Sequence, residues 1–328
     1  MSGVDWSGLL KWSLQHTDGT VDGHIDEADR DFLQEAIKHA MSQVRDPHEA
    51  VIEALGQLKS EDVTVQLAGL SIVNKCLDEA PEVSRNLAKL GAVGPLFTCL
   101  QSSDPRVVEL VLDLCFAFAL PNNTALQSIV HEQKGLTKFC LCLQASSSAV
   151  DKKRDVITPE EIAKWSNVQV KCFGCLAALI RNHPESTAAF AQRNGLVWIT
   201  YGLKSKNWRL QQKVFTLATY LCPRVPIPRE TLTRWTAELS VMLRTDLYLT
   251  IGPQHGELMA QFLQALAPSL IKESLPVLPQ VATVVGERAT RLDKMTSESR
   301  DNPEIDDFSI EVELLREIVN TLENHTTR

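Results

Sequence analysis

The chain has little positive charge, few aromatic residues and no long apolar run. Its 328 residues include 33 Lys and Arg against 41 Asp and Glu, a formal net charge of −8. Because nucleic-acid binding needs a basic surface that replaces counterions, this balance disfavours a nucleic-acid partner. No apolar run approaches the length of a membrane span, and the first residues lack the pattern of a secretory signal. We therefore expect a soluble, cytoplasmic protein that contacts no membrane.

The sequence also lacks the motifs of common enzyme classes. No G-x-G-x-x-G, phosphate loop or nucleophile elbow occurs, so we expect this chain to bind no nucleotide of its own. His131-Glu132 begins like a zinc-protease helix, but Gly135 stands where the second histidine should be. His183, in a turn before Pro184, suits a capping or solvated role better than catalysis. We expect no enzymatic activity, no catalytic residue and no cofactor.

Two cysteine pairs raise the possibility of a metal or redox site. Cys140-x-Cys142 and Cys172-x-x-Cys175 together supply four sulfurs, the number that a structural zinc site needs. Residues two apart on a helix do not face the same way, however, and Cys172 and Cys175 continue an apolar helical stripe. The pattern favours buried, reduced thiols and no metal, with a metal or redox site as the alternative.

One phrase recurs along the chain: an apolar helix end, a glycine and a new apolar helix. The glycines are Gly91, Gly135 and Gly195, spaced by 44 and 60 residues. Glycine just past a helix end favours the left-handed conformation that closes the helix, so we expect it at all three positions. The long apolar helices that accompany these phrases are predicted at 63–77, 105–120, 167–180 and 208–221.

A period of about 42–44 residues with one long apolar helix is typical of armadillo or HEAT arrays. The sequence predicts an all-α, armadillo-like right-handed helical repeat solenoid with helical caps at both ends, and we expect a monomer. Ser-rich, charged residues at about 145–164 are expected to lengthen the loop before the third long helix. The predicted parts are an amino-terminal segment with a linker (1–27), the repeat domain (28–266) and capping helices with an acidic linker (267–328).

Two sets of residues are not explained by core packing alone. In the amino-terminal segment, Trp6, Leu9, Leu10 and Leu14 line one helical face, with Trp12 nearby. They form either a first helix packed on the array or a segment that inserts into a partner. The second set lies beside the core stripes of the long helices, where armadillo-type arrays present their concave binding face. Its members are Arg106, Glu109 and Asp113 on one helix, Gln169, Lys171 and Arg181 on the next, and Arg209, Gln212 and Lys213 on the third. Of these, Lys171, Arg181, Arg209, Gln212 and Lys213 are the predicted partner contacts, with a solvated helix face as the alternative.

Several phrases occur in the order known from one family: LLKWSLQH near the start, LDEA at 77–80, LIRNHPE at 179–185 followed by FAQRNGL, and a closing RLDKM…FSIEVELL. Over most of its length the chain thus resembles the armadillo-type nucleotide exchange factors of the heat-shock-70 chaperone, the Fes and HspBP type. The LLKWS and LDEA phrases carry most weight, because NHPE-type turns followed by N-G-L occur in many armadillo proteins.

The resemblance implies a co-chaperone that acts through the way it binds the chaperone and catalyses no covalent step. Family members grip one lobe of the chaperone's nucleotide-binding domain in the concave face, which is incompatible with the closed lobes, so ADP leaves. Ala80 of LDEA matches the turn at the first grip point, Lys213 a basic position on the last long helix, and Arg181 the arginine of LIRNH. The amino-terminal segment, residues 5–16 here, is expected to help client proteins leave the chaperone.

The alternative is a general armadillo scaffold or adaptor that is not tied to chaperones. Import receptors of this fold carry a Trp-x-x-x-Asn motif that is repeated along their long helices. Here Trp208-x-x-x-Gln212 is the one approximation, and Trp165 has no Asn at that spacing. An import-type groove for basic peptides is therefore disfavoured.

Overall fold

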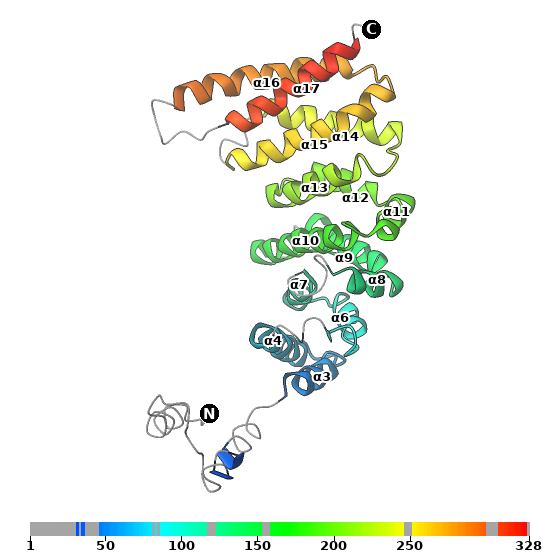
Figure 1. Cartoon of the computed structure of the whole chain (residues 1–328), viewed down its shortest axis with the longest axis vertical. Coiled ribbons are helices and arrows are strands. Elements are labelled where there is room, and N and C mark those ends of the chain that lie inside the picture. The colour runs from blue at the N-terminus through cyan, green and yellow to red at the C-terminus, as the bar shows by residue number, and fades with distance from the viewer. Residues whose placement is uncertain are drawn as a thin grey trace, which may run out of the picture.

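The computed structural model describes residues 31–32, 34–36, 46–80, 83, 86–116, 123–152, 158–245, 251–299 and 308–326. Over these residues the chain is a stack of α-helices with no β-strand (Figure 1). The helices are α3 (Pro47–Gln57), α4 (Val63–Glu79), α6 (Val93–Cys99), α7 (Pro105–Leu114), α8 (Thr124–Glu132), α9 (Gly135–Lys152), α10 (Pro159–Ile180), α11 (Pro184–Gln192), α12 (Leu196–Lys204), α13 (Trp208–Leu221), α14 (Arg229–Arg244), α15 (Pro253–Lys272), α16 (Leu278–Ser299) and α17 (Ser309–Thr326).

Polar side chains at the helix starts explain why the predicted long helices begin where they do. Asp104 accepts the backbone N–H of Arg106 at 2.9 Å, directly before Pro105 in the first turn of α7. Asn207 accepts the N–H groups of Arg209 and Leu210 at the start of α13. The prediction of 208–221 is confirmed at both ends of α13.

One layer of the stack, which we call the ladder, consists of helices that pack on one another in chain order. Its members are α4, α7, α10, α13, α15 and α17. Among the remaining helices, α3, α6, α11 and α12 lie along the other side of the stack (Figure 1). Buried apolar side chains form one continuous core along the stack, from Val51 in α3 to Leu322 in α17. A stack of this kind offers one long, regular surface, made of the exposed sides of the ladder helices.

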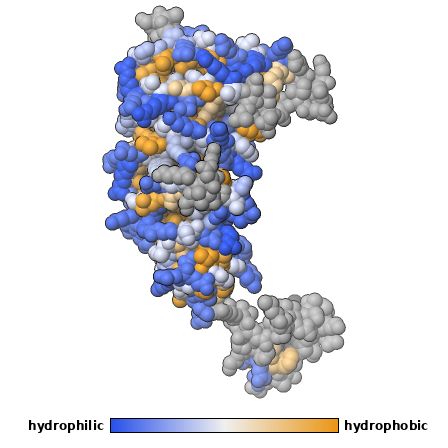
Figure 2. Space-filling model, turned by 180° about the vertical axis from the view of Figure 1, so that it is seen from behind, coloured by the Kyte–Doolittle hydropathy of each residue, from blue (hydrophilic) through white to orange (hydrophobic). Residues whose placement is uncertain are grey.

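The outer surface of the stack is mostly polar. The face seen in Figure 2 is largely hydrophilic, with separate hydrophobic patches. Among the described helices, not one combines the length and the apolar character needed to cross a membrane.

The prediction of left-handed glycines is confirmed at Gly91, where φ is 77°. It is wrong at Gly135 and Gly195. The residues with positive φ are instead those just before them, Lys134 at 61° and Asn194 at 59°. Asparagine adopts this conformation more readily than most residues, which releases the following glycine from that role.

At Gly135 and Gly195 the backbone lies too close to residues of the preceding helix for any side chain to fit. The N–H of Gly195 donates to the carbonyl of Phe190 at 2.8 Å, the long-range bond of a Schellman motif. A Cβ at Gly195 would lie 2.4 Å from that carbonyl oxygen, and a Cβ at Gly135 would lie 2.4 Å from Val130. The turn between α8 and α9 and the turn between α11 and α12 are therefore too tight for a side chain at the glycine.

The described residues of 145–164 lie in helices rather than in a longer loop, so that expectation is wrong. α9 continues to Lys152 and α10 begins at Pro159, which places most of this stretch in two helices. The hydroxyls of Ser146 and Ser147 donate to the carbonyl of Leu143, within the same helix. Serine is compatible with helix when its hydroxyl is satisfied in this way, so the Ser-rich composition does not end α9.

The domain boundary predicted at 267 falls inside α15, which continues through Pro268 to Lys272. Beyond it, α16 and α17 pack as a pair, and α17 also packs on α15. The interior of this end contains a buried ion pair between Arg288 of α16 and Glu311 of α17, with Nε and Oε1 2.5 Å apart and both side chains fully buried. Burial raises the pKa of Glu311, although Arg288 acts in the opposite direction.

His255 of α15 makes stability depend on pH. Burial, and secondly the charge of Arg288, lowers the pKa of His255 to about 4. The ring packs on Phe215, with centroids 5.2 Å apart. Because the unfolded chain takes up this proton near pH 6.5 and the folded chain does not, the stabilising contribution is complete above that pH and is lost as pH falls towards 4. We expect acidification from pH 7.5 to 5 to lower the unfolding free energy by ~1–2 kcal/mol through His255.

Urea unfolding of the wild type and of His255→Gln at the two pH values measures this contribution. The difference between the two proteins isolates His255 from Glu311, whose raised pKa acts with the opposite sign. An equal loss of stability in both proteins on acidification would contradict the assignment.

Candidate partner-binding site

The structure brings two of the predicted partner-binding residues together on the ladder. Arg181, just past the end of α10, and Lys213 on α13 line one hollow of about 290 Å³, together with Phe116 from the end of α7. Arg181, Lys213 and Phe116 are all exposed. The hollow thus combines two cations and an aromatic ring, contributed by three consecutive ladder helices.

Phe116 is the residue of this site that the sequence did not reveal. It lies in a π-type turn that ends α7, and 42% of its surface is exposed. Its ring packs over Gly174, where an added Cβ would lie 3.5 Å away. The ammonium of Lys213 lies 5.7 Å from the ring centroid, within the range of a cation–π contact. The only sequence signal for it was an aromatic residue near the end of an apolar run.

The guanidinium of Arg181 reaches towards α13. Its Nη2 donates to the carbonyl of Thr216 at 3.4 Å, and the side chain remains exposed. Arg209 and Gln212 lie on the same helix but do not line the hollow. Arg209 is exposed with its guanidinium 5.3 Å from the ring centroid of Trp208, and Gln212 is half-buried.

Lys171 has a structural role that the sequence did not predict. Its Nζ donates to Glu109 Oε1 and to Asp113 Oδ2, both at 2.7 Å, and so joins α10 to α7. Burial alone would lower the pKa of Lys171, but the hydrogen bonds to Asp113 and Glu109 outweigh it and raise the pKa. Two carboxylates compensate this ammonium, so Lys171 does not present an unpaired positive charge to a partner.

Ala80 lies apart from the hollow. It is the residue that ends α4, and it is buried, with 7% of its surface exposed. The predicted amino-terminal contact residues, Trp6, Leu9, Leu10, Trp12 and Leu14, lie outside the described residues.

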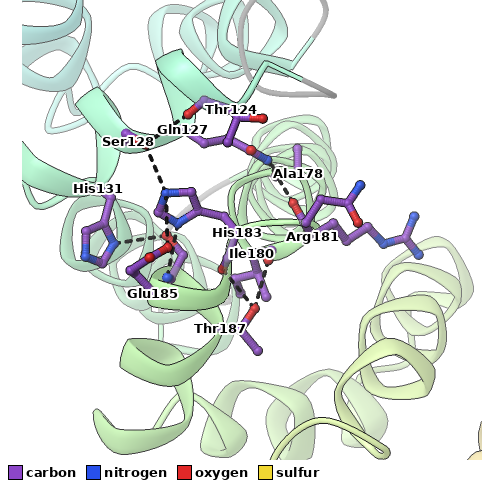
Figure 3. A network of polar contacts seen from close by, with 12 residues as sticks. Thr124, Gln127, Ser128, His131, Ala178, Ile180, Arg181, His183, Glu185 and Thr187 are labelled. Atoms are coloured by element: carbon purple, nitrogen blue, oxygen red, sulfur yellow. Dashed lines mark hydrogen bonds and ion pairs between the residues drawn. The ribbon is translucent and has the colours of Figure 1, made fainter.

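A buried amide supports the wall that carries Arg181. Gln127 of α8 is 1% exposed, and its Nε2 donates to the carbonyls of Ala178 at 2.6 Å and of Arg181 at 2.9 Å (Figure 3). The last carbonyls of a helix have no partner within it, so Gln127 satisfies two groups that the end of α10 leaves open. On the other side of the turn, the N–H of Asn182 is 3.1 Å from the hydroxyl of Tyr220 on α13.

His183 fixes the start of α11, as the capping prediction proposed, but in a buried environment. Its Nδ1 accepts the N–H of Ser186 at 3.2 Å, which places the proton of the neutral ring on Nε2. That nitrogen lies 3.2 Å from the hydroxyl of Ser128, which donates to the carbonyl of Thr124 (Figure 3). The nearby ring of His131 contacts the hydroxyl of Ser186 at 3.0 Å. This network connects α8 with the turn that carries Arg181.

Cys172 and Cys175 are part of the core, as predicted. Both are fully buried, and their thiols donate to the carbonyls of Phe139 at 3.2 Å and of Leu112 at 3.3 Å. Burial raises the pKa of both thiols well above the ordinary value. A protonated sulfur that packs in this way joins α10 to its neighbours. Within the described part of the chain, no group of three or more His, Cys, Asp or Glu residues is arranged to hold a metal ion.

Solved structures similar to this chain include a designed armadillo repeat protein, at 14% identity and a TM-score of 0.55, with 83% of this chain and 99% of that chain covered. An engineered protein covers 86% of this chain and 100% of its own, at 14% identity and a TM-score of 0.57. A structure concerning a conserved phosphorylation switch in the interaction between cadherin and beta-catenin covers all of this chain and 54% of its own, at 16% identity and a TM-score of 0.56.

No protein-family model matches the sequence, and no curated protein matches it significantly. The structural likenesses confirm the predicted fold: this chain is an all-α, armadillo-like helical repeat solenoid.

Proposed function

We propose that this chain is a protein-binding solenoid that uses the ladder surface around Arg181, Lys213 and Phe116. The observation that carries the proposal is the hollow between α10 and α13, where two exposed cations and an exposed ring meet on the regular face of the array. Armadillo-type arrays offer extended concave surfaces of this kind to their partners. The structure concerning cadherin and beta-catenin is one example of an interaction within this fold.

The partner that we propose is the nucleotide-binding domain of a heat-shock-70 chaperone, in the cytoplasm, with accelerated release of ADP as the result. Support comes from the order of the phrases LLKWSLQH, LDEA and LIRNHPE, and from the position of Arg181 and Lys213 in one hollow. No covalent step is needed. A factor that binds the open form of the domain more tightly than the closed form shifts the equilibrium by that difference in affinity.

Two other features from the sequence keep their proposed roles. Residues 5–16 are proposed to aid client release. Ala80, being buried at the end of α4, is proposed to act through the shape of its turn rather than through its side chain.

Charge reversal in the hollow tests the proposed function. At a concentration below saturation, we expect Arg181→Glu combined with Lys213→Glu to slow ADP release at least about 10-fold relative to the wild type, because reversing two contact charges costs at least about 1.4 kcal/mol of binding, a factor of ten. The measurement is release of fluorescent ADP from a cytosolic heat-shock-70 chaperone after addition of ATP. Lys294→Glu is the matched control, since it makes the same kind of change at an exposed position on α16.

If saturating wild-type protein does not accelerate release, the chaperone proposal is wrong, and a general adaptor becomes the better interpretation. Acceleration that is equally strong with the double variant would instead show that the hollow is not the contact surface.

A further inference from the structure

A second hollow adjoins the first and belongs to no role described so far. It has a volume of about 590 Å³ and lies between α11 and the end of α13. Tyr220 lines this second hollow, and its hydroxyl contacts the N–H of Asn182, which lines the first. One pair of residues thus forms the ridge between the two hollows, and α13 forms a wall of both.

Arg224 is held in a fixed position at the second hollow. Its guanidinium stacks 4.0 Å from the ring centroid of Tyr220, and Nη1 donates to the carbonyl of the same residue at 2.8 Å. A guanidinium has five N–H donors, so most of them remain for a ligand. The side chain is exposed. A cation held in this way loses little freedom when it binds an anion.

The two hollows carry positive charge in a chain that is negative overall. Their lining residues include Arg181, Lys213 and Arg224 and no carboxylate. None of these three cations forms an ion pair with a carboxylate among the described residues, whereas Lys171 on the neighbouring stretch of α10 is paired with two. With a formal net charge of −8 for the chain, this concentration of uncompensated cations selects acidic ligands locally.

The walls between the cations suit a narrow, extended ligand. The first hollow is lined by Gly174, Ala177 and Ala178, and the second by Ala188 and Ala191, so small residues flank the track. An exposed amide side chain lies beside them in each hollow, Asn182 in the first and Gln192 in the second, and amide groups can pair with the N–H and C=O groups of an extended backbone. The hydroxyls of Thr187 and Thr216 already donate to backbone carbonyls of the solenoid itself.

We propose that the two hollows together bind one extended acidic segment of a partner protein, with two carboxylates about five residues apart. Lys213 and Arg224 are separated by 11 positions, eight along α13 and three in the turn after Leu221. Eight helical steps of 1.5 Å and a compact turn place their backbones roughly 16 Å apart, the length of about five residues of extended chain. One carboxylate pairs with Lys213 and Arg181, the other pairs with Arg224, and an apolar side chain between them contacts the small residues. The proposal deepens the proposed function, since it uses part of the same surface.

Fluorescence anisotropy with the full chain tests the proposal. The probe is a fluorescein-labelled ten-residue peptide of serine and leucine with two glutamates five positions apart. Its controls are the same peptide with both glutamates replaced by glutamine and one with the glutamates adjacent. We expect the spaced acidic peptide to bind at least about 10-fold more tightly than either control, because both cation sites are then occupied at once.

Variants connect the binding to the two hollows. We expect Arg224→Ala and Lys213→Ala each to weaken binding about 5–10-fold, and Lys294→Ala on α16 to leave it unchanged. Arg224→Lys keeps the charge but loses the planar guanidinium that can form two parallel hydrogen bonds. We therefore expect its affinity for the peptide to lie between those of Arg224→Ala and the wild type. Circular dichroism confirms that each variant is folded.

Equal binding of the glutamate and glutamine peptides would overturn the proposal, as would unchanged binding by Arg224→Ala. Tighter binding of a single-stranded RNA of ten nucleotides, weakened by the same variants, would also overturn it by showing that the cations select phosphate. ADP release measured on the same samples separates the two proposals. If the wild type binds the spaced peptide but does not accelerate ADP release, the peptide site stands and the chaperone function fails.

Discussion

We expect Glu311→Ala to be the most destabilising single substitution considered for this protein, at ~3 kcal/mol of unfolding free energy. Glu311 and Arg288 are both fully buried, and their contact joins α17 to α16. Removing one member of a buried pair is expensive because the other charge stays in the interior without that partner. Here the loss occurs at the carboxy-terminal end of the stack, where α16 and α17 cover the last core layer.

Urea unfolding followed by circular dichroism measures the effect. Glu313→Ala is the matched control, because Glu313 lies two residues away on α17 but is exposed, and we expect a change below about 0.5 kcal/mol there. The double variant Arg288→Met, Glu311→Leu removes both charges and replaces them with apolar groups, so it should be less destabilised than Glu311→Ala. A double variant that is less stable than Glu311→Ala would contradict this account of the pair.

Gly195→Ala is expected to lower the unfolding free energy by ~2 kcal/mol, because the new methyl group has no room. Its Cβ would lie 2.4 Å from the carbonyl oxygen of Phe190 and 2.5 Å from atoms of the Phe190 ring. That carbonyl accepts the N–H of Gly195 itself, so the clash can be relieved only by opening the turn between α11 and α12. Phe190 is fully buried, which prevents its ring from moving aside.

Gly56→Ala makes the same chemical change with the opposite expected sign. Gly56 lies on the exposed side of α3, it is not followed by proline, and an added Cβ would meet no atom beyond its own helix backbone within 4 Å. Alanine has a better helix propensity than glycine, so we expect a gain of ~0.5–1 kcal/mol. Thermal or urea unfolding of the two variants beside the wild type checks both signs together. Destabilisation by both substitutions would show that glycine matters at Gly195 for a reason other than close approach.

The helices of this fold could be predicted because several local signals agree. In α13, Asn207 caps the first turn, apolar residues repeat with helical spacing, and Pro223 follows the last turn. The role of Gly195 was harder to see, because a turn that closes with Asn194 in the left-handed conformation has nearly the same sequence as one that closes with glycine. The extension of α9 was missed because serine composition alone does not show whether the hydroxyls are satisfied within a helix.

The partner-binding site was only partly visible from the sequence. Arg181 and Lys213 were found because each lies beside the core stripe of its own helix. Lys171 shares that local property, and what distinguishes it is its pairing with Glu109 and Asp113, 62 and 58 residues earlier in the chain. Such a pairing depends on how one repeat stacks on the next. Local spacing cannot reveal that stacking.

The support beneath Arg181 has a consequence for the energetics of recognition. Gln127, His183 and the contact between Asn182 and Tyr220 hold the turn after α10 in one conformation before any partner arrives. The entropy of ordering this turn is therefore lost when the chain folds rather than when it binds. A preorganised surface of this kind keeps more of its contact energy as affinity, so a short ligand can bind with few contacts.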